Sequence, residues 1–152
     1  MPSFRSERRV RHSAEQMFDL VADVERYPEF VPLCTALRVR SRRPEGKGRE
    51  TLIADMSVGY KMIRERFTSR VVLDKPRLRV VVEYIDGPFS HMENIWTFHD
   101  ELEAGRSLVT FFIDYEFRSR ILGSVMGSMF DAAFRKFSEA FERRADAVYG
   151  RA

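Results

Sequence analysis

The sequence has one cysteine, Cys34, and three histidines among its 152 residues. A single cysteine excludes an intramolecular disulfide and any metal site built from several cysteines, and it fits a reducing compartment. The first eight residues are charged where a secretory signal peptide needs an apolar run. The uncharged segment 121–130 falls well short of the ~20 residues that cross a bilayer. We therefore expect a cytoplasmic protein.

Composition favours one globular domain over residues 1–150. With 44% hydrophobic and 32% charged residues, the chain has enough apolar side chains for a buried core. Its net charge of +3 permits contact with anionic membranes or RNA, but the basic residues are interspersed with 23 acidic ones. Net charge alone therefore does not identify a binding partner. We do not expect the protein to bind DNA.

Residues 118–149 give the longest helical pattern in the chain. Its apolar residues recur at steps of mostly three, four and seven, so they share one helix face. They are Leu122, Met126, Phe130, Ala133, Phe137, Phe141 and Val148. Each buried Phe or Leu contributes roughly 1.5 to 3 kcal/mol, so this face needs a large partner such as a concave sheet. Near its start, Gly123 and Gly127 indicate either close packing against a strand or room for an apolar guest.

Most of the remaining sequence alternates polar and apolar residues in the manner of β-strands. We expect strands at 4–11, 33–43, 50–60, 62–73, 78–84, 91–99 and 109–117. The sequence Ser13-Ala14-Glu15-Gln16 has the spacing of a capping box that begins a helix at Ala14. Tyr27-Pro28 interrupts that helix before a short second turn over 29–32, and residues 44–48 connect a hairpin.

The predicted order is one strand, two short helices, six consecutive strands and a long C-terminal helix. This is an α+β arrangement in which a seven-stranded antiparallel sheet wraps around the C-terminal helix. Its inward side chains are rich in aromatic residues. They either fill the core completely or leave an apolar cleft between sheet and helix, and the sequence leaves both open.

Two motifs carry a resemblance to a known family. The segment 13–24, SAEQMFDLVADV, and the segment 27–32, YPEFVP, followed by Cys34, resemble the opening signature of the coenzyme-Q-binding, START-like family. That family lies within the polyketide cyclase/dehydrase superfamily and includes bacterial ribosome association toxins. Supporting matches are residues 86–89, DGPF, Trp96 with Phe98, and residues 115–117, YEF. His12 and Leu33 stand where relatives often have an aromatic residue and a glycine.

The resemblance implies a helix-grip fold, of the START-like or Bet v 1-like kind, that holds a hydrophobic ligand. Ubiquinone or its polyprenyl tail is the leading candidate, respiration is the process served, and no cofactor is required. Met126, Met129 and Phe130 are expected to hold the tail, while Glu65, Asn94 and Tyr115 are candidates for a polar end. The full predicted ligand-binding set is Phe30, Val31, Met56, Glu65, Phe67, Tyr84, Asn94, Trp96, Phe98, Phe111, Tyr115, Met126, Met129 and Phe130. A register slip of one residue would instead expose Glu65.

The residues give little support to catalysis. His91 and His99 are eight residues apart on one strand face, too far to ligate one metal, and we interpret the histidines as surface residues. Cys34 has no nearby histidine pattern, which favours a buried structural thiol over a nucleophile. No glycine-rich phosphate loop is present. We therefore expect a binding protein without catalytic or metal-binding residues.

Two functions remain open. The first is a binding protein that shields a quinone or similar lipid in the cytoplasm and exchanges it at the inner membrane surface. The second is a translation inhibitor that binds the large ribosomal subunit and blocks subunit association. The densest basic cluster is either a solvated edge or a phosphate contact, and the latter would make binding steeply salt-dependent. It consists of Arg38, Arg40, Arg42, Arg43, Lys47 and Arg49.

Overall fold

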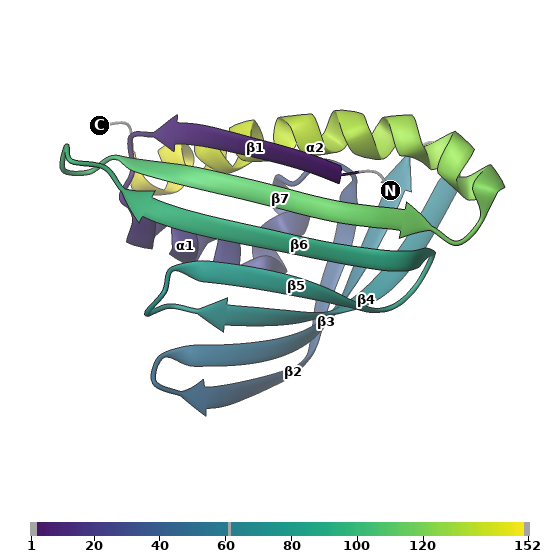
Figure 1. Cartoon of the computed structure of the whole chain (residues 1–152), viewed down its shortest axis with the longest axis horizontal. Coiled ribbons are helices and arrows are strands. Elements are labelled where there is room, and N and C mark those ends of the chain that lie inside the picture. Colours follow the sequence, from purple (N-terminus) through teal and green to yellow (C-terminus); the bar gives the residue numbers. More distant parts are fainter. Residues whose placement is uncertain (1–2, 61, 151–152) are drawn as a thin grey trace.

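The computed structural model describes residues 3–60 and 62–150. The elements in chain order are β1 (Ser3–Val10), α1 (Ala14–Ala22), the 3₁₀ helix η1 (Val24–Glu29), β2 (Cys34–Gly46), β3 (Arg49–Tyr60), β4 (Ile63–Asp74), β5 (Arg79–Asp86), β6 (Phe89–Asp100), β7 (Ser107–Phe117) and α2 (Arg120–Tyr149). The strands form one seven-stranded antiparallel sheet in the order β1-β7-β6-β5-β4-β3-β2 (Figure 1). The predicted α+β class and sheet are confirmed.

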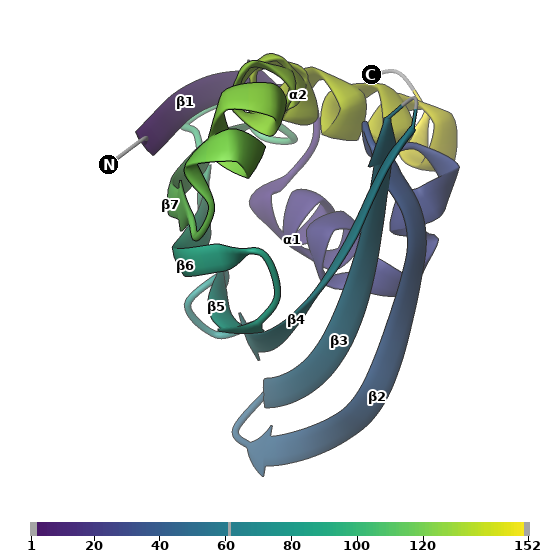
Figure 2. The same cartoon turned by 90° about the vertical axis from the view of Figure 1, so that its right-hand side faces the viewer.

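The sheet curls around the helices. Figure 2 shows α1 between the limb formed by β5 to β7 and the limb formed by β2 to β4, with α2 across the top. Strand alternation decides which side chains face this interior. In β6, Met92, Asn94, Trp96 and Phe98 are buried as predicted, and they pack with the inward residues of β7 and α2 into one core.

The helix at Ala14 begins as predicted but ends early. Ser13 Oγ accepts from the Gln16 amide at 3.1 Å, and Gln16 Oε1 accepts from the Ser13 amide at 3.0 Å, which completes the capping box. Asp23 then leaves the helical region, with φ −83° and ψ 66°, and the chain continues as η1 with Pro28 inside it. The predicted second short helix is therefore present, but it spans Val24–Glu29 and not residues 29–32. The Tyr27 hydroxyl donates to the Val21 carbonyl and folds this segment back on α1, a contact that sequence spacing does not report.

The hairpin between β2 and β3 is tighter than predicted. Gly46 pairs with Arg49, so the loop is only Lys47 and Gly48, with φ of 56° and 78°. Positive φ at both positions is the geometry of a type I′ turn, whose twist matches that of the flanking strands. Leu33, predicted to begin a strand, instead has φ 69°, and β2 begins at Cys34.

The buried stripe of α2 largely follows the prediction. Met126, Phe130, Ala133 and Phe141 are buried. Val148 is 52% exposed, so its place in the stripe is wrong; Ala145 is the last fully buried apolar residue, because the final turn extends beyond the core. A Cβ at Gly127 would meet nothing within 4 Å, so this glycine does not mediate close packing against a strand.

The C-terminal half of α2 is tied to β1 and its following loop. Ser138 Oγ lies 3.1 Å from Ser6 Oγ, and Arg8 Nε donates to Glu142 Oε1 at 2.6 Å. His12 is buried and its Nε2 lies 2.7 Å from Asp146 Oδ1, so its interpretation as a surface histidine is wrong. His12 lies between β1 and α1 and is buried only because α2 packs against it. The local sequence around His12 does not specify this contact. Among the described residues, the long-range side-chain hydrogen bonds of α2 begin at Ser138.

Candidate functional site

An apolar cavity of about 110 Å³ lies between the inner face of the sheet and α2. Residues around η1 close one side, inward residues of β2 to β7 form the floor, and α2 forms the roof. The lining residues are Val24, Tyr27, Val31, Pro32, Leu33, Leu37, Ala54, Met56, Val58, Phe67, Ser69, Val71, Val80, Val82, Phe89, Met92, Asn94, Trp96, Phe111, Ile113, Phe130, Ala133, Phe134, Phe137 and Phe141. An apolar concave site with few polar groups is the usual pattern for a small-molecule pocket.

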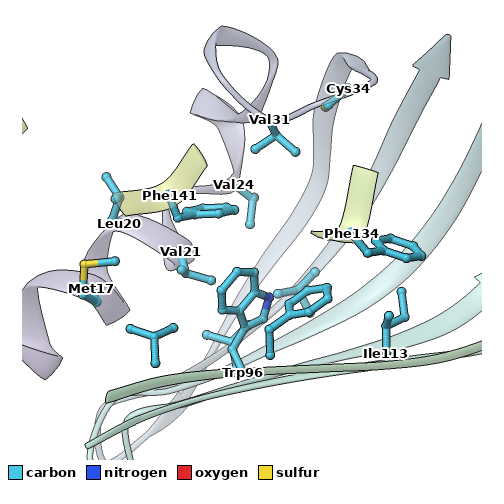
Figure 3. Packing of buried hydrophobic residues seen from close by; sticks show 14 of the residues in the cluster. Met17, Leu20, Val21, Val24, Val31, Cys34, Trp96, Ile113, Phe134 and Phe141 are labelled. Atoms are coloured by element: carbon cyan, nitrogen blue, oxygen red, sulfur yellow. The ribbon is translucent and has the colours of Figure 1, made fainter. Parts of the chain in front are cut away.

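Aromatic rings hold the floor and the roof together. Figure 3 shows the Trp96 indole on the sheet below Phe141 of α2, with Val21 and Val24 beside them. The Trp96 ring lies 4.9 Å from that of Phe141 and 4.7 Å from that of Phe111, both in edge-to-face arrangements. Such pairs are worth about 0.5 to 1.5 kcal/mol beyond their buried area. These contacts therefore stabilise the packing of α2 on the sheet at this wall of the cavity.

The described lining residues include four with polar side-chain groups: Tyr27, Ser69, Asn94 and Trp96, whose indole carries an N–H donor. Asn94 Nδ2 donates to the Phe112 carbonyl at 2.8 Å, and the Tyr27 hydroxyl donates to the Val21 carbonyl. Burial raises the pKa of Tyr27, so the phenol stays protonated. The Ser69 hydroxyl is buried without a hydrogen-bond partner. Tyr27 is the only titratable group among these lining residues, so the cavity itself supplies no acid-base pair near neutral pH.

Seven of the predicted ligand-binding residues come together around the cavity. They are Val31, Met56, Phe67, Asn94, Trp96, Phe111 and Phe130. The other predicted residues lie outside its lining: Phe30, Glu65, Tyr84, Phe98, Tyr115, Met126 and Met129. Their part in binding a ligand stays a prediction.

Each of these outlying residues has a different location. Phe98 packs on Phe18 beyond Trp96, with ring centroids 5.9 Å apart, and Phe30 lies behind Phe141. The Tyr84 hydroxyl accepts from the Phe89 amide, and Tyr115 packs against Phe134. Glu65 is half-buried near the start of β4. Met126 is buried, while Met129 is partly buried, both on the first turns of α2.

Sequence reasoning missed Ser69 and Ala133 as site residues. Both lie on faces predicted to be buried, where their small side chains leave space. At Ser69, a single hydroxyl also interrupts a run of apolar inward residues. That interruption was the available signal for Ser69. The buried structural thiol predicted at Cys34 is confirmed: burial raises its pKa to about 11, so it is protonated at neutral pH.

Residues 10–142 match the model of the family described as polyketide cyclase / dehydrase and lipid transport. The chain belongs to this family. Ribosome association toxin RatA from Rickettsia prowazekii is 32% identical over 97% of this chain and 99% of its own length. Coenzyme Q-binding protein COQ10 homolog B, mitochondrial, from Xenopus laevis is 34% identical over 91% of this chain, which spans 56% of that relative.

Solved structures of the family confirm the helix-grip fold. An 18 kDa protein from Caulobacter crescentus is 33% identical, with a TM-score of 0.79 over 99% of both chains. A Streptomyces aromatase/cyclase, 20% identical, has a TM-score of 0.71 over 95% of this chain and 90% of its own, a likeness of fold alone. The same fold thus occurs in a protein named as an aromatase/cyclase, while a relative by sequence is named for coenzyme Q binding.

No described helix is long and apolar enough to span a membrane. Within residues 3–60 and 62–150, no group of three or more His, Cys, Asp or Glu side chains is arranged to hold a metal ion. Outside the cavity, His91 lies 2.9 Å from Asp114 on the outer face of the sheet.

Proposed function

We propose that the chain binds a hydrophobic ligand without catalysis, and that ubiquinone or its polyprenyl tail is the ligand class. The observation that carries this proposal is the apolar cavity between sheet and α2, with its aromatic walls. The relative named as a coenzyme Q-binding protein supports the choice of ligand. The cavity's lack of an acid-base pair among the described lining residues supports binding rather than catalysis.

The ligand requires the cavity to widen. Its volume of about 110 Å³ is smaller than the ~150 Å³ that accommodates benzene in an engineered protein cavity and the ~300 Å³ at the lower end for ligand pockets. Met126 and Met129 stand next to Phe130 on the first turns of α2. Thioether side chains change shape at little cost, so we place the tail between these turns and the last strands.

We place the protein in the cytoplasm, with ligand exchange at the inner membrane surface. Exposed apolar side chains support this contact. Met62, between β3 and β4, is 94% exposed, and Ile121, in the first turn of α2, is 79% exposed. Both lie at the end of the sheet where β3 and β7 finish (Figure 1). Two apolar side chains at one end of the molecule would enter the headgroup boundary of a bilayer.

Filling the cavity should weaken ligand binding. Ala133 lines the roof, so Ala133→Leu adds three carbon atoms to the space that a ligand needs. We expect affinity for a short-chain ubiquinone to fall by about tenfold or more, since crowding of this kind typically costs about 1 to 3 kcal/mol. Trp96, the only tryptophan, lines the cavity and reports binding through quenching of its fluorescence by the quinone.

Ala132→Leu is the matched control for this substitution. It makes the same change on the neighbouring residue of the same helix, where the side chain is exposed and does not line the cavity. The control should bind the quinone like the parent. If Ala133→Leu folds and still binds with parental affinity, the ligand does not occupy this cavity.

A second candidate function is association with the ribosome, and an arginine-rich outer face favours it. Arg42 pairs with Glu25 and Glu50, and Arg49 pairs with Asp74, so these members of the predicted basic cluster have carboxylate partners within the chain. The sheet also places arginines of β4 on the same outer face as those of β2, on the other side of β3. The arginine face consists of Arg38, Arg40 and Arg43 of β2 with Arg66 and Arg70 of β4, all exposed.

One buried carboxylate lies within this face. Asp55 accepts from Arg40 Nε at 2.6 Å and from the Thr68 hydroxyl at 2.5 Å. Burial alone would raise the pKa of Asp55, but these hydrogen bonds outweigh burial and hold that pKa below its ordinary value. Asp55 is thus ionised and fixes Arg40. Guanidinium groups bind phosphate in a bidentate manner, so the arginine face suits the phosphate backbone of RNA.

Salt dependence tests the arginine face. Replacing Arg38, Arg43 and Arg66 with Ser should weaken binding to a short RNA duplex and reduce the slope of log affinity against log salt by about 2 to 3. The matched control replaces Arg120, Lys136 and Arg143, three exposed cations of α2, with Ser. Equal losses for both triple variants would indicate net charge alone, and retention of RNA binding with loss of binding to anionic vesicles would assign the face to membranes.

A further inference from the structure

The structure describes three buried serines, and they differ in their hydrogen bonds. Ser107 Oγ donates to the His12 carbonyl at 2.8 Å, and Ser138 Oγ lies 3.1 Å from Ser6 Oγ. Ser69 is 5% exposed, yet its hydroxyl has no partner. A buried hydroxyl without a partner loses its hydrogen bonds to water and gains none in return. Ser69 therefore needs an explanation that the fold alone does not supply.

The Ser69 hydroxyl makes no hydrogen bond to its cross-strand neighbours. Ser69 lies on the inner face of β4 between Phe67 and Val71, which also line the cavity. Its partner on β3 is Ala54, which has no polar side chain, and its partner on β5 is Tyr84, whose hydroxyl accepts from the Phe89 amide. The remaining direction open to the Ser69 side chain is the cavity that it lines.

We propose that Ser69 is the hydrogen-bond donor that orients the bound ligand, and that it donates to an uncharged acceptor oxygen, such as a quinone carbonyl. This inference rests on the proposed binding of a hydrophobic ligand and names the polar group that such a ligand carries. The occupied site satisfies the Ser69 hydroxyl, and the rest of the ligand contacts apolar walls. Ser69 thereby selects among ligands that the apolar walls alone would not distinguish.

The charge of the lining narrows the ligand class further. No Lys, Arg or His is present among the described lining residues. A carboxylate buried there would have no cation to pair with, and burying an unpaired charge is strongly unfavourable. The site therefore favours neutral carbonyl compounds over fatty acids of similar length.

Two matched probes test the donor. Hexyl-1,4-benzoquinone carries carbonyl oxygens, whereas hexylbenzene has a similar ring and the same tail without them. Quenching of Trp96 fluorescence measures binding of the quinone. Binding of hexylbenzene is measured by its displacement of the bound quinone. A hydrogen bond contributes about 0.5 to 1.5 kcal/mol net. Ser69→Ala should therefore lower the affinity for the quinone by about 2- to 13-fold and leave the affinity for hexylbenzene unchanged. Ser69→Thr, which keeps the hydroxyl, should retain the parental preference for the quinone.

Ser138→Ala provides the control for losing a buried serine hydroxyl. It removes a partnered hydroxyl outside the cavity, so it should lower the thermal midpoint and leave both affinities unchanged. Ser69→Ala should instead raise the midpoint of the ligand-free protein, since it removes an unpaired polar group.

The results that would contradict the role of Ser69 differ from the result that would contradict ligand binding itself. Equal weakening of both probes by Ser69→Ala would make Ser69 a packing residue and overturn the inference. Unchanged binding of both probes would mean that water satisfies the hydroxyl, and would also overturn it. If the parent binds neither probe, the proposed function itself fails, and the role of Ser69 fails with it.

Discussion

Trp96→Ala should lower the free energy of unfolding by about 3 to 5 kcal/mol, the range for truncation of a large buried aromatic side chain. Trp96 is 3% exposed and sits between the sheet and α2, in ring contact with Phe111 and Phe141. Its removal leaves a void against a roof held in place by other contacts, so the site cannot collapse fully. Urea unfolding followed by circular dichroism measures the loss.

Ile95→Ala is the matched control on the same strand. Ile95 is the neighbouring residue on the outer face, where it is partly exposed, so its truncation should cost clearly less. A one-residue shift in the register of β6 would exchange the two residues between faces. A larger loss for Ile95→Ala than for Trp96→Ala would therefore contradict the register described here.

Phe141→Ala should also cost about 3 to 5 kcal/mol, and part of that loss should be recovered by a small apolar ligand. Phe141 is buried, lines the cavity and contacts Trp96, Tyr27 and Phe30. Truncation enlarges the cavity beyond its present 110 Å³ or so, and an apolar cavity of about 150 Å³ binds benzene. Thermal midpoints with and without saturating benzene measure the recovery, because a ligand that binds only the folded state stabilises it.

Phe98→Ala separates this effect from destabilisation in general. Phe98 is equally buried but lies outside the cavity lining, in contact with Phe18. The variant should lose comparable stability and gain less from benzene. Equal recovery in both variants would show that benzene enters the core wherever space is made, and that the present cavity has no special role.

Sequence periodicity predicted much of the fold because the sheet repeats every two residues and the helix every 3.6. The inward placement of Trp96 and Phe130 follows from that repeat. It does not show which element covers each inward residue: Trp96 lines the cavity, while Phe98, two residues along the same face, packs against Phe18 of α1.

Other predictions failed because they depend on contacts between residues far apart in the sequence. His12 is buried because α2 brings Asp146 against it across 134 positions of sequence. Leu33 adopts a left-handed conformation that glycine would adopt more easily, and its carbonyl accepts from the Gly59 amide at 3.0 Å. Half of the predicted ligand-binding residues line the cavity, and all of these but Val31 lie on regular strands or on α2. The remainder depends on the path of the chain between elements and on side-chain volumes.

The side-chain hydrogen bonds that attach α2 to the rest of the fold are unevenly distributed, which bears on how the proposed ligand would enter. Its side-chain hydrogen bonds to β1, α1 and η1 all come from residues at or after Ser138, while the cavity lies under Phe130 to Phe141 and the methionines lie before it. The first turns are held by the apolar packing of Met126 and Phe130 without such hydrogen bonds, so we expect them to open more readily than the C-terminal turns. Such local opening requires less free energy than global unfolding, because most of the core stays intact. Exchange of the proposed ligand would then be limited by the frequency of this partial opening and would not require low overall stability.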